Sequence, residues 1–595
     1  MKRQYLAGMI TIALLQSACS YNDKSHQASQ TPEQVGMPIA SEAQTNELKK
    51  EEMMLDELQA QAPVTNMAVQ QGHKVKSAKL LMSQERVATG SAMAAAPAVM
   101  AADSFSAMYP EPIAMPREER DKFEHFKDNP IKQVATEPVS TFSLDVDTGS
   151  YALVRQWLKQ GRLPASDAVR TEELINYFSY DYPKTKSEHP FAVNTELTTA
   201  PWQPDHYLLR IGVQAQDSHA QQMPAANLVF LVDVSGSMDE PNKLPLVISS
   251  LQMLTQQLRP QDKVSLVVYA GRTEVVLEPT NNKADILAAL GRLQAGGSTA
   301  GASALELAYK MARKGYIKNG INRILLATDG DFNVGVTSTE QIKDMVKRER
   351  ETGVTLSTLG FGQGNFNDAM MEQIADVGNG NYSYIDSVSE ARKVLVDEMS
   401  STFNTVAKDV KVQVEFNPQQ VSEYRLIGYE NRQLNREDFN NDKVDAGDVG
   451  AGKSVTAIYE ITPKGAASSV DPLRYQNEKQ ASAGKVIPEF AFLKIRYKQP
   501  SATSSTLLTQ PLVLPKNVIS FANGTNDHRF ATAVAGFGQL LRQSPNMGNL
   551  SYGQVLQIAQ QAKGADKMGT RAEFIQLVQN VQALSQKTAL QAQAE

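Results

Sequence analysis

The sequence is poor in the residues on which common enzyme chemistry depends. It contains one cysteine, Cys19, and seven histidines, none of which lies between His219 and His528. A single cysteine excludes an internal disulfide. The long interval without histidine or further cysteine excludes His-based triads, Cys nucleophiles and typical zinc sites from the middle of the chain.

Strong charge of one sign is also lacking, because the net charge is only −6. Nucleic-acid binding needs a basic face, so this mild acidity argues against a nucleic-acid partner. The remaining composition, 42% hydrophobic and 21% charged, is ordinary for a soluble globular protein. At 595 residues the chain is too long for one hydrophobic core and predicts several domains.

The N-terminus reads as an export signal covering residues 1–18. Lys2 and Arg3 precede an apolar stretch from Tyr5 to Leu15, which is too short for an ordinary membrane span. Small residues then lead to Cys19, and this arrangement resembles a bacterial lipoprotein processing site, although Gln16 stands where that family usually has Leu. The alternative is a plain secretory signal that is cut after Ala18.

The lipoprotein resemblance implies lipid chains on Cys19 that anchor the protein to a membrane. Ser20 follows in place of Asp, which in lipoproteins of two-membrane bacteria usually implies the outer membrane, facing the periplasm. Residues 19–129 are rich in Gln, Ala, Ser, Met and charge and lack sustained periodicity. We therefore expect a disordered tether between the lipid and the folded body.

The most informative stretch runs from Asn227 to Met238, NLVFLVDVSGSM. A continuous apolar run that ends in a polar turn is typical of a buried strand in a parallel sheet, and functional groups gather at the carboxyl ends of such strands. Asp233, Ser235 and Ser237 alternate in the turn, so their oxygens can converge on one point. Such oxygen ligands suit a hard cation such as Mg²⁺. The simpler alternative is that a Ser or Asp of this turn caps the next helix.

Two further stretches favour the metal site. A Gly-rich turn, AGGST, carries Thr299 and opens a helix, and a second apolar strand, ILLATDG, ends at Asp329. Together the residues resemble the metal-ion-dependent adhesion site of the von Willebrand factor type A (VWA) domain. The matching positions are Asp233, Ser235, Ser237, Thr299 and Asp329. The resemblance implies bound Mg²⁺ (or Mn²⁺) and a protein partner whose Asp or Glu completes the coordination.

The chain around this motif predicts an α/β fold inserted in a β-sandwich. Strands and helices mostly alternate through residues 223–404, which gives a Rossmann-like, doubly wound, mainly parallel sheet. Strands with apolar alternation lie on both sides, at 191–222 and 405–520, and predict one β-sandwich built from both flanks. Two separate small β units are the alternative.

Two other regions complete the expected body. Residues 130–190 form a segment that precedes the VWA-like domain, with helical spacing at Tyr151–Gln160 and at Ala168–Tyr182. Residues 521–595 turn helical, and their apolar faces are expected to pack on the sandwich. The run from Asp145 to Ser150, DVDTGS, resembles a degenerate copy of the main motif, and a capping turn is favoured there over a second metal site.

The long motifs narrow the resemblance. STFSLDVDTGSYALVRQWL, RTEELINYFSYDYP and VEFNPQQVSEYRLIGYENRQL, together with the VWA-like motifs, resemble a bacterial family of VWA lipoproteins with a dedicated N-terminal segment and a C-terminal domain of unknown function. The resemblance covers the chain from about Pro130 onward. It implies architecture more than a reaction.

One nucleotide-site spelling needs a different interpretation. Gly447 to Ser454, GDVGAGKS, fits the P-loop pattern, but an acidic loop precedes it and an alternating strand follows. A P-loop follows an apolar strand and opens a helix, so we interpret this stretch as a Gly-rich hairpin turn.

The sequence therefore favours an envelope-anchored binding protein over an enzyme. Few direct charges would leave the ion electrophilic, so that an acidic group of a partner completes the coordination. A structural or assembly scaffold of the envelope is the alternative. A metal-dependent hydrolase is less favoured, because hydrolysis usually needs a general base or acid near the metal.

Overall fold

The computed structural model describes residues 120–184, 188–217, 223–297, 301–330, 338–471 and 488–594. All of these residues belong to one compact unit, Pro110–Glu595. The expected signal peptide, Cys19 and the expected tether as far as residue 119 therefore lie outside the described residues, and so does Thr299.

The VWA region contains the expected mainly parallel sheet, with the strand order β10-β9-β8-β5-β6-β7. Neighbouring strands pair in parallel except for β7, which runs antiparallel to β6. The strands are β5 (Ala226–Asp233), β6 (Lys263–Tyr269), β7 (Thr273–Thr280), β8 (Ile321–Thr328), β9 (Thr355–Gly360) and β10 (Tyr382–Tyr384).

Side chains of β5 alternate between two separate cores. Phe230 and Val232 pack in one core with α4 and α5, whereas Val229 and Leu231 pack in the other with α6 and α7. This alternation follows from the two-residue period of a strand and gives a sheet with helices on both faces. The helices are α4 (Leu244–Gln257), α5 (Lys283–Leu290), α6 (Gly301–Lys314), α7 (Thr339–Arg350) and α8 (Asp368–Val377), followed by α9 (Val388–Arg392), a π-helical turn (Lys393–Asp397) and α10 (Met399–Phe403).

The prediction of one sandwich built from both flanks is confirmed. One antiparallel sheet has the order β1-β12-β14-β4-β3, so strands that precede the VWA region pair directly with strands that follow it. Leu209 of β4 lies opposite Tyr459 of β14, for example. Strands of this sheet are β1 (Lys132–Gln133), β3 (Phe191–Thr199), β4 (Tyr207–Ala215), β12 (Val421–Ile427) and β14 (Ser454–Pro463).

The second antiparallel sheet has the order β13-β11-β15-β16, and β2 also pairs with β11. Its strands are β2 (Val139–Ser143), β11 (Thr405–Phe416), β13 (Val449–Gly450), β15 (Glu489–Lys498) and β16 (Ser505–Val513). Apolar side chains of both sheets, such as Ile211 and Leu493, share one core. The VWA region lies between the end of β4 and the start of β11 and is therefore an insertion in the sandwich.

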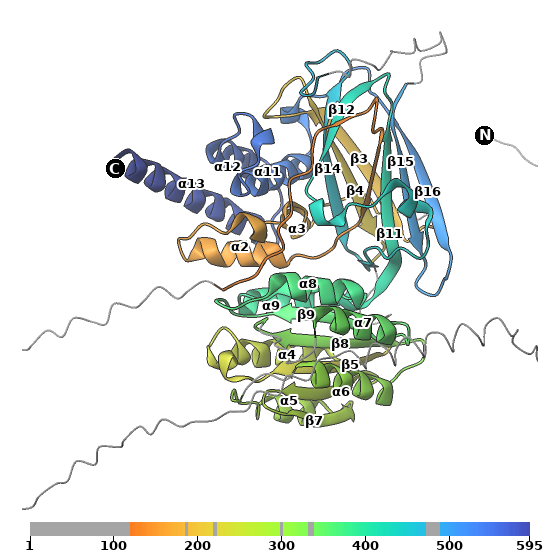
Figure 1. Ribbon diagram of the computed structural model, residues 1–595, viewed down its shortest axis with the longest axis vertical. Helices are drawn as coiled ribbons and strands as arrows, with labels where there is room; N and C mark the ends of the chain where they lie inside the picture. Colours follow the sequence, from red (N-terminus) through yellow and green to blue (C-terminus); the bar gives the residue numbers. More distant parts are fainter. Residues whose placement is uncertain are drawn as a thin grey trace, which may run out of the picture. The chain divides into compact units, whose positions relative to one another are not determined.

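Helices from both ends of the body form a further core. The early helices are α2 (Gly149–Lys159) and α3 (Thr171–Asn176), and the late helices are α11 (Asn526–Leu541), α12 (Tyr552–Gln561) and α13 (Thr570–Ala594). They pack together and against Leu208, Ile427 and Ile458 of the first sheet, as expected for the C-terminal helices (Figure 1). Among the described residues, no helix has both the length and the apolar character that a membrane span requires.

The folded body starts earlier than Pro130. Asp121 Oδ1 accepts hydrogen bonds from the backbone of Gly364, at 2.9 Å, and of Phe366, at 2.8 Å. The amide of Lys122 also donates to the carbonyl oxygen of Phe366 at 2.8 Å. The last ten residues assigned to the tether, 120–129, thus include a segment that hydrogen-bonds to the VWA region.

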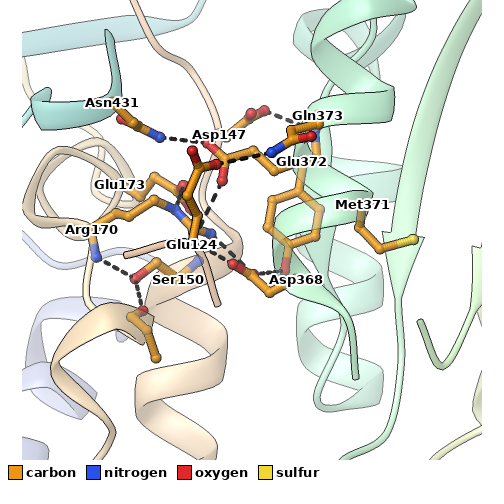
Figure 2. A network of polar contacts seen from close by, with 12 residues as sticks. Glu124, Asp147, Ser150, Arg170, Glu173, Asp368, Met371, Glu372, Gln373 and Asn431 are labelled. Atoms are coloured by element: carbon orange, nitrogen blue, oxygen red, sulfur yellow. Dashed lines mark hydrogen bonds and ion pairs between the residues drawn. The ribbon is translucent and has the colours of Figure 1, made fainter. Parts of the chain in front are cut away.

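A buried network of charges holds the VWA region to the N-terminal segment. Figure 2 shows Arg170, which precedes α3, between Glu173 and Asp368, the first residue of α8. Arg170 Nη2 donates to Asp368 Oδ1 at 3.1 Å, and its Nε donates to Glu173. All three side chains are at most 1% exposed. Charge-assisted hydrogen bonds of this kind offset the cost of burying the carboxylates.

The same face of α8 continues the network. Glu372 and Asp376 follow Asp368 at four-residue intervals, so the three carboxylates lie along one side of the helix. Arg432, in the sandwich, donates to Glu372 Oε1 at 3.0 Å and also to Asp376. Burial raises the pKa of Glu372 well above its ordinary value, and the nearby guanidinium groups of Arg170 and Arg432 oppose that rise.

A second cluster of buried charges holds α9 against the N-terminal segment. Arg155 of α2 donates to Asp386 through Nε at 2.8 Å and to Glu390 of α9 through Nη2 at 2.7 Å. It also reaches Glu573 of α13 at 3.2 Å. One buried guanidinium therefore joins the N-terminal segment, the VWA region and the C-terminal helices.

We predict that Arg170→Met strongly destabilises the body, because it leaves Asp368 and Glu173 buried without their cation. The expected loss in free energy of unfolding is about 3–5 kcal/mol. Arg313→Met is the matched control, since Arg313 pairs with Glu349 at the surface, where its side chain is 47% exposed. That change should cost about 1 kcal/mol or less. Denaturant midpoints measure both, and equal shifts would contradict the role given to Arg170.

Candidate metal centre

The centre is built at the carboxyl end of β5. All eight residues of this strand are buried, and the strand ends at Asp233, which is fully buried too. The Ser235 amide donates to Asp233 Oδ1 at 2.8 Å, which turns the chain sharply after the strand. This turn places the following hydroxyl side chains on the same side as the carboxylate.

The two predicted serines do converge. Ser235 Oγ and Ser237 Oγ lie 3.0 Å apart. Ser235 is 3% exposed, and a short 3₁₀ turn, Gly236–Asp239, carries Ser237 back toward it. The structure therefore brings Asp233, Ser235 and Ser237 together, as the spacing predicted.

The Gly-rich turn also reaches this loop. The Gly236 amide donates to the carbonyl oxygen of Gly297 at 3.1 Å, and the Gly296 amide donates to that of Val234 at 2.8 Å. Gly297 has φ +91°, and a Cβ there would lie 3.0 Å from the Gly271 nitrogen. Thr299 is outside the described residues, but the residues that lead to it are bonded to the loop of Asp233.

Asp329 arrives from the neighbouring strand. β8 pairs in parallel with β5, so the ends of the two strands share one edge of the sheet. Thr328 Oγ1 donates to Asp233 Oδ2 at 2.9 Å, and Asp329 follows with no exposed surface. The hydrogen bond from Thr328, the last residue of β8, therefore orients the carboxylate of Asp233.

A lysine that we did not predict as part of the site, Lys243, lies at this edge of the sheet. The Lys243 Nζ atom is 3.0 Å from Asp329 Oδ2, and the lysine side chain is only 4% exposed. Lys243 stands directly before α4 and eighty-six residues before Asp329. Nothing in its local sequence distinguishes Lys243 from a surface lysine at the start of a helix. Its contact with Asp329 can therefore be recognised only in the folded structure.

Burial dominates the electrostatics of Asp233. It raises the pKa of that carboxyl to about 6, and the charge of Asp329 adds to the rise. The hydrogen bonds from Ser235 and Thr328 favour the charged form and oppose it. A buried carboxylate of this kind is stabilised by any cation that approaches it.

The donor set fits a hard divalent cation. Two carboxylates and two hydroxyl groups supply oxygen alone, which suits Mg²⁺ or Mn²⁺ and does not suit softer metals. Among the described residues there is no cluster of three or more His, Cys, Asp or Glu side chains with metal-binding geometry. An ion held here would therefore need ligands besides carboxylates, and the hydroxyls of Ser235 and Ser237 lie where they could supply them.

The run from Asp145 to Ser150 is a turn and a structural contact. Asp145 Oδ1 accepts from the Asp147 amide at 3.0 Å, while Asp147 Oδ1 accepts from the Tyr382 amide at 2.8 Å. Ser150 Oγ donates to the carbonyl oxygen of Ala168 at 2.7 Å. The Asp147–Tyr382 hydrogen bond joins the VWA region to the N-terminal segment. Arg432 Nη2 lies 3.5 Å from Asp145 Oδ1 and 3.4 Å from Asp147 Oδ2, so a guanidinium already pairs with both carboxylates of this run.

The stretch from Gly447 to Ser454 is not a P-loop, but our prediction of a hairpin there was wrong. β13 pairs with β11, whereas β14 pairs with β12 and β4, so the turn connects two different sheets. Gly450 is required because a Cβ there would lie 1.8 Å from the carbonyl oxygen of Ser401. Lys453 donates to Glu398 at 3.2 Å.

Comparisons with known proteins agree with this architecture. The von Willebrand factor type A domain matches residues 227–398, and a region described as von Willebrand factor matches residues 117–210. The C-terminal domain of uncharacterized protein YfbK matches residues 401–584. The fold and the site therefore define a VWA domain protein.

The chain is 53% identical over 468 residues to uncharacterized protein YfbK of Escherichia coli (strain K12), which covers 77% of this chain and 80% of that protein. The chain belongs to the YfbK family. It is also 34% identical over 186 residues to uncharacterized protein sll0103 of Synechocystis sp. (strain ATCC 27184 / PCC 6803 / Kazusa), over 31% of this chain and 43% of that protein. A solved structure, von Willebrand factor type A from Catenulispora acidiphila, covers 64% of this chain and 89% of its own, with 16% identity and a TM-score of 0.37.

We predict that Thr328→Val weakens Mg²⁺ binding about tenfold or more, because Asp233 loses the hydrogen bond that orients it. The valine keeps the shape but also removes the acceptor of the Gly330 amide, which donates to Thr328 Oγ1 at 3.2 Å. Thr358→Val is the matched control, since Thr358 on β9 is equally buried and donates instead to the carbonyl oxygen of Met371 at 2.9 Å. Calorimetric titration should find the control unchanged, and an equal loss in both variants would contradict the orienting role.

Proposed function

We propose that this protein is an envelope-anchored binding protein. In this proposal, Mg²⁺ held by Asp233, Ser235, Ser237, Thr299 and Asp329 is completed by an Asp or Glu of a protein partner. VWA domains commonly mediate protein binding, and this chain has such a domain. The observation that carries the proposal is the convergence of the two serine hydroxyls, 3.0 Å apart, beside a buried carboxylate.

The charge of the site favours an acidic ligand. Neutral hydroxyls neutralise none of the ion's charge, and a carboxylate from outside then completes both the coordination and the charge. The buried lysine beside Asp329 removes a further negative charge from the site. An anionic side chain is the ligand that this arrangement attracts most strongly.

Binding is favoured over hydrolysis by the state of the ionisable groups. Asp233 accepts hydrogen bonds on both carboxylate oxygens, and Asp329 is paired with Lys243. A general base needs a carboxylate that can take up a proton from water, and both of these are engaged. We therefore propose no catalytic residue and no enzymatic activity.

The proposed location follows from the N-terminal sequence. Lipid chains on Cys19 would anchor the protein in a membrane, and Ser20 favours the outer membrane with the body facing the periplasm. The partner would then be another protein of the envelope.

A permanent scaffold of the envelope is a second candidate function. The buried clusters around Arg155 and Arg170 fasten the VWA region to the rest of the body, which suits a fixed building block. In that case the partner would bind through another surface, and the metal would only stabilise a loop.

We predict that partner capture requires the metal. Envelope proteins cross-linked to the lipidated full-length chain should be recovered with Mg²⁺ and lost with chelator, and Asp233→Ala should lose them in Mg²⁺ as well. Glu437→Ala, at an exposed position of the sandwich, is the control and should retain them. Capture that survives both chelator and Asp233→Ala, with the fold intact, would favour the scaffold.

A further inference from the structure

The lysine beside Asp329 is held in place from several sides. Its side chain is 4% exposed, and its amide donates to the carbonyl oxygen of Glu240 at 2.9 Å, which fixes the start of α4. Burying an ammonium group is costly unless it has an opposite charge to pair with. Asp329 provides that charge at 3.0 Å.

The loop after β9 leaves room for the stem of this lysine. Gly362 has φ +72°, and a Cβ there would lie only 2.4 Å from Lys243 Cε. The Tyr384 hydroxyl donates to the carbonyl oxygen of Gly362 and so ties the loop to β10. Only glycine both adopts this backbone conformation readily and leaves the space, so the fold accommodates the lysine here.

We propose that Lys243 is an internal counter-cation that competes with the divalent ion for Asp329 and sets the metal affinity of the site. The inference rests on the proposed function, because it assumes that Asp329 belongs to the metal centre. Without a metal, the ammonium neutralises one of the two carboxylates, so the site keeps a net charge of about −1. An incoming divalent ion then meets both a weaker attraction and a fixed positive neighbour.

The positive charge of Lys243 also increases the attraction of the metal-bound site for an anion. Two carboxylates, one ammonium and one divalent ion leave about one positive charge, whereas the same site without the lysine would be neutral. The metal and an acidic side chain should therefore bind more strongly together than either binds alone. Lys243 would act as a positioning and specificity residue and would not itself be a metal ligand.

Calorimetric titration of Mg²⁺ into the metal-stripped body tests this inference. Lys243→Gln keeps a donor for Asp329 but removes the charge, and we expect it to bind Mg²⁺ about tenfold tighter than the parent. Lys243→Arg keeps the charge and should stay near the parent. Lys314→Met removes an exposed lysine at the far end of α6, about 20 Å along the helix from its start near the site, and should change nothing.

Thermal unfolding gives a second measurement that does not depend on the stability of the free variant. Mg²⁺ should raise the melting temperature of Lys243→Gln more than that of the parent, because tighter binding to the folded state stabilises it further. Parent binding with no tighter binding in Lys243→Gln, by either method, would overturn the inference alone. Absence of binding in both proteins would overturn the inference and the proposed metal function together.

Discussion

Two carboxylates buried side by side at one edge of a parallel sheet are the constraint around which this site is organised. Asp233 ends β5, Asp329 directly follows the neighbouring β8, and neither has exposed surface. Burial disfavours the charged form of Asp233 and raises its pKa. Each nearby feature reduces this cost: backbone and hydroxyl donors on Asp233, the ammonium of Lys243 on Asp329, and the proposed divalent ion between the loops.

The edge of the sheet that carries the candidate metal site lies next to the interface between the VWA region and the N-terminal segment. Gly330 follows Asp329, and a Cβ there would lie 2.4 Å from the Asn367 nitrogen. The next residue, Asp368, begins α8 and pairs with Arg170. Asn367, which packs against the residue after Asp329, is therefore continuous with α8, the helix that Arg170 holds in place. The interface with the N-terminal segment thus restrains one side of the site.

Strand motifs made much of this architecture predictable. The apolar runs ending at Asp233 and Asp329 indicate parallel strands, and functional groups gather at the carboxyl ends of such strands, which predicts that both residues lie at one edge of the sheet. Alternating strands on both sides of the insert likewise predicted one sandwich. Local periodicity and position in a known fold class were sufficient for these features.

Other features depend on contacts that sequence patterns do not encode. β7 has no regular alternation, because it is a half-buried edge strand, and we did not predict it. The expected helix over Ala168–Tyr182 is shortened to Thr171–Asn176, because Tyr180 and Tyr182 pack in the core from a segment without regular secondary structure. Lys243 and Arg170 find their acidic partners across long sequence separations, and a lysine or arginine in isolation predicts only a surface position.

The most direct test of the account is whether the body binds a divalent ion at Asp233. Mg²⁺ and Mn²⁺ would be titrated calorimetrically into the protein and into Asp233→Ala, with circular dichroism to confirm that both are folded. The account predicts one binding site in the parent and none in the variant. Equal heats in the two proteins, or binding in neither, would contradict it and leave the VWA fold serving as a scaffold.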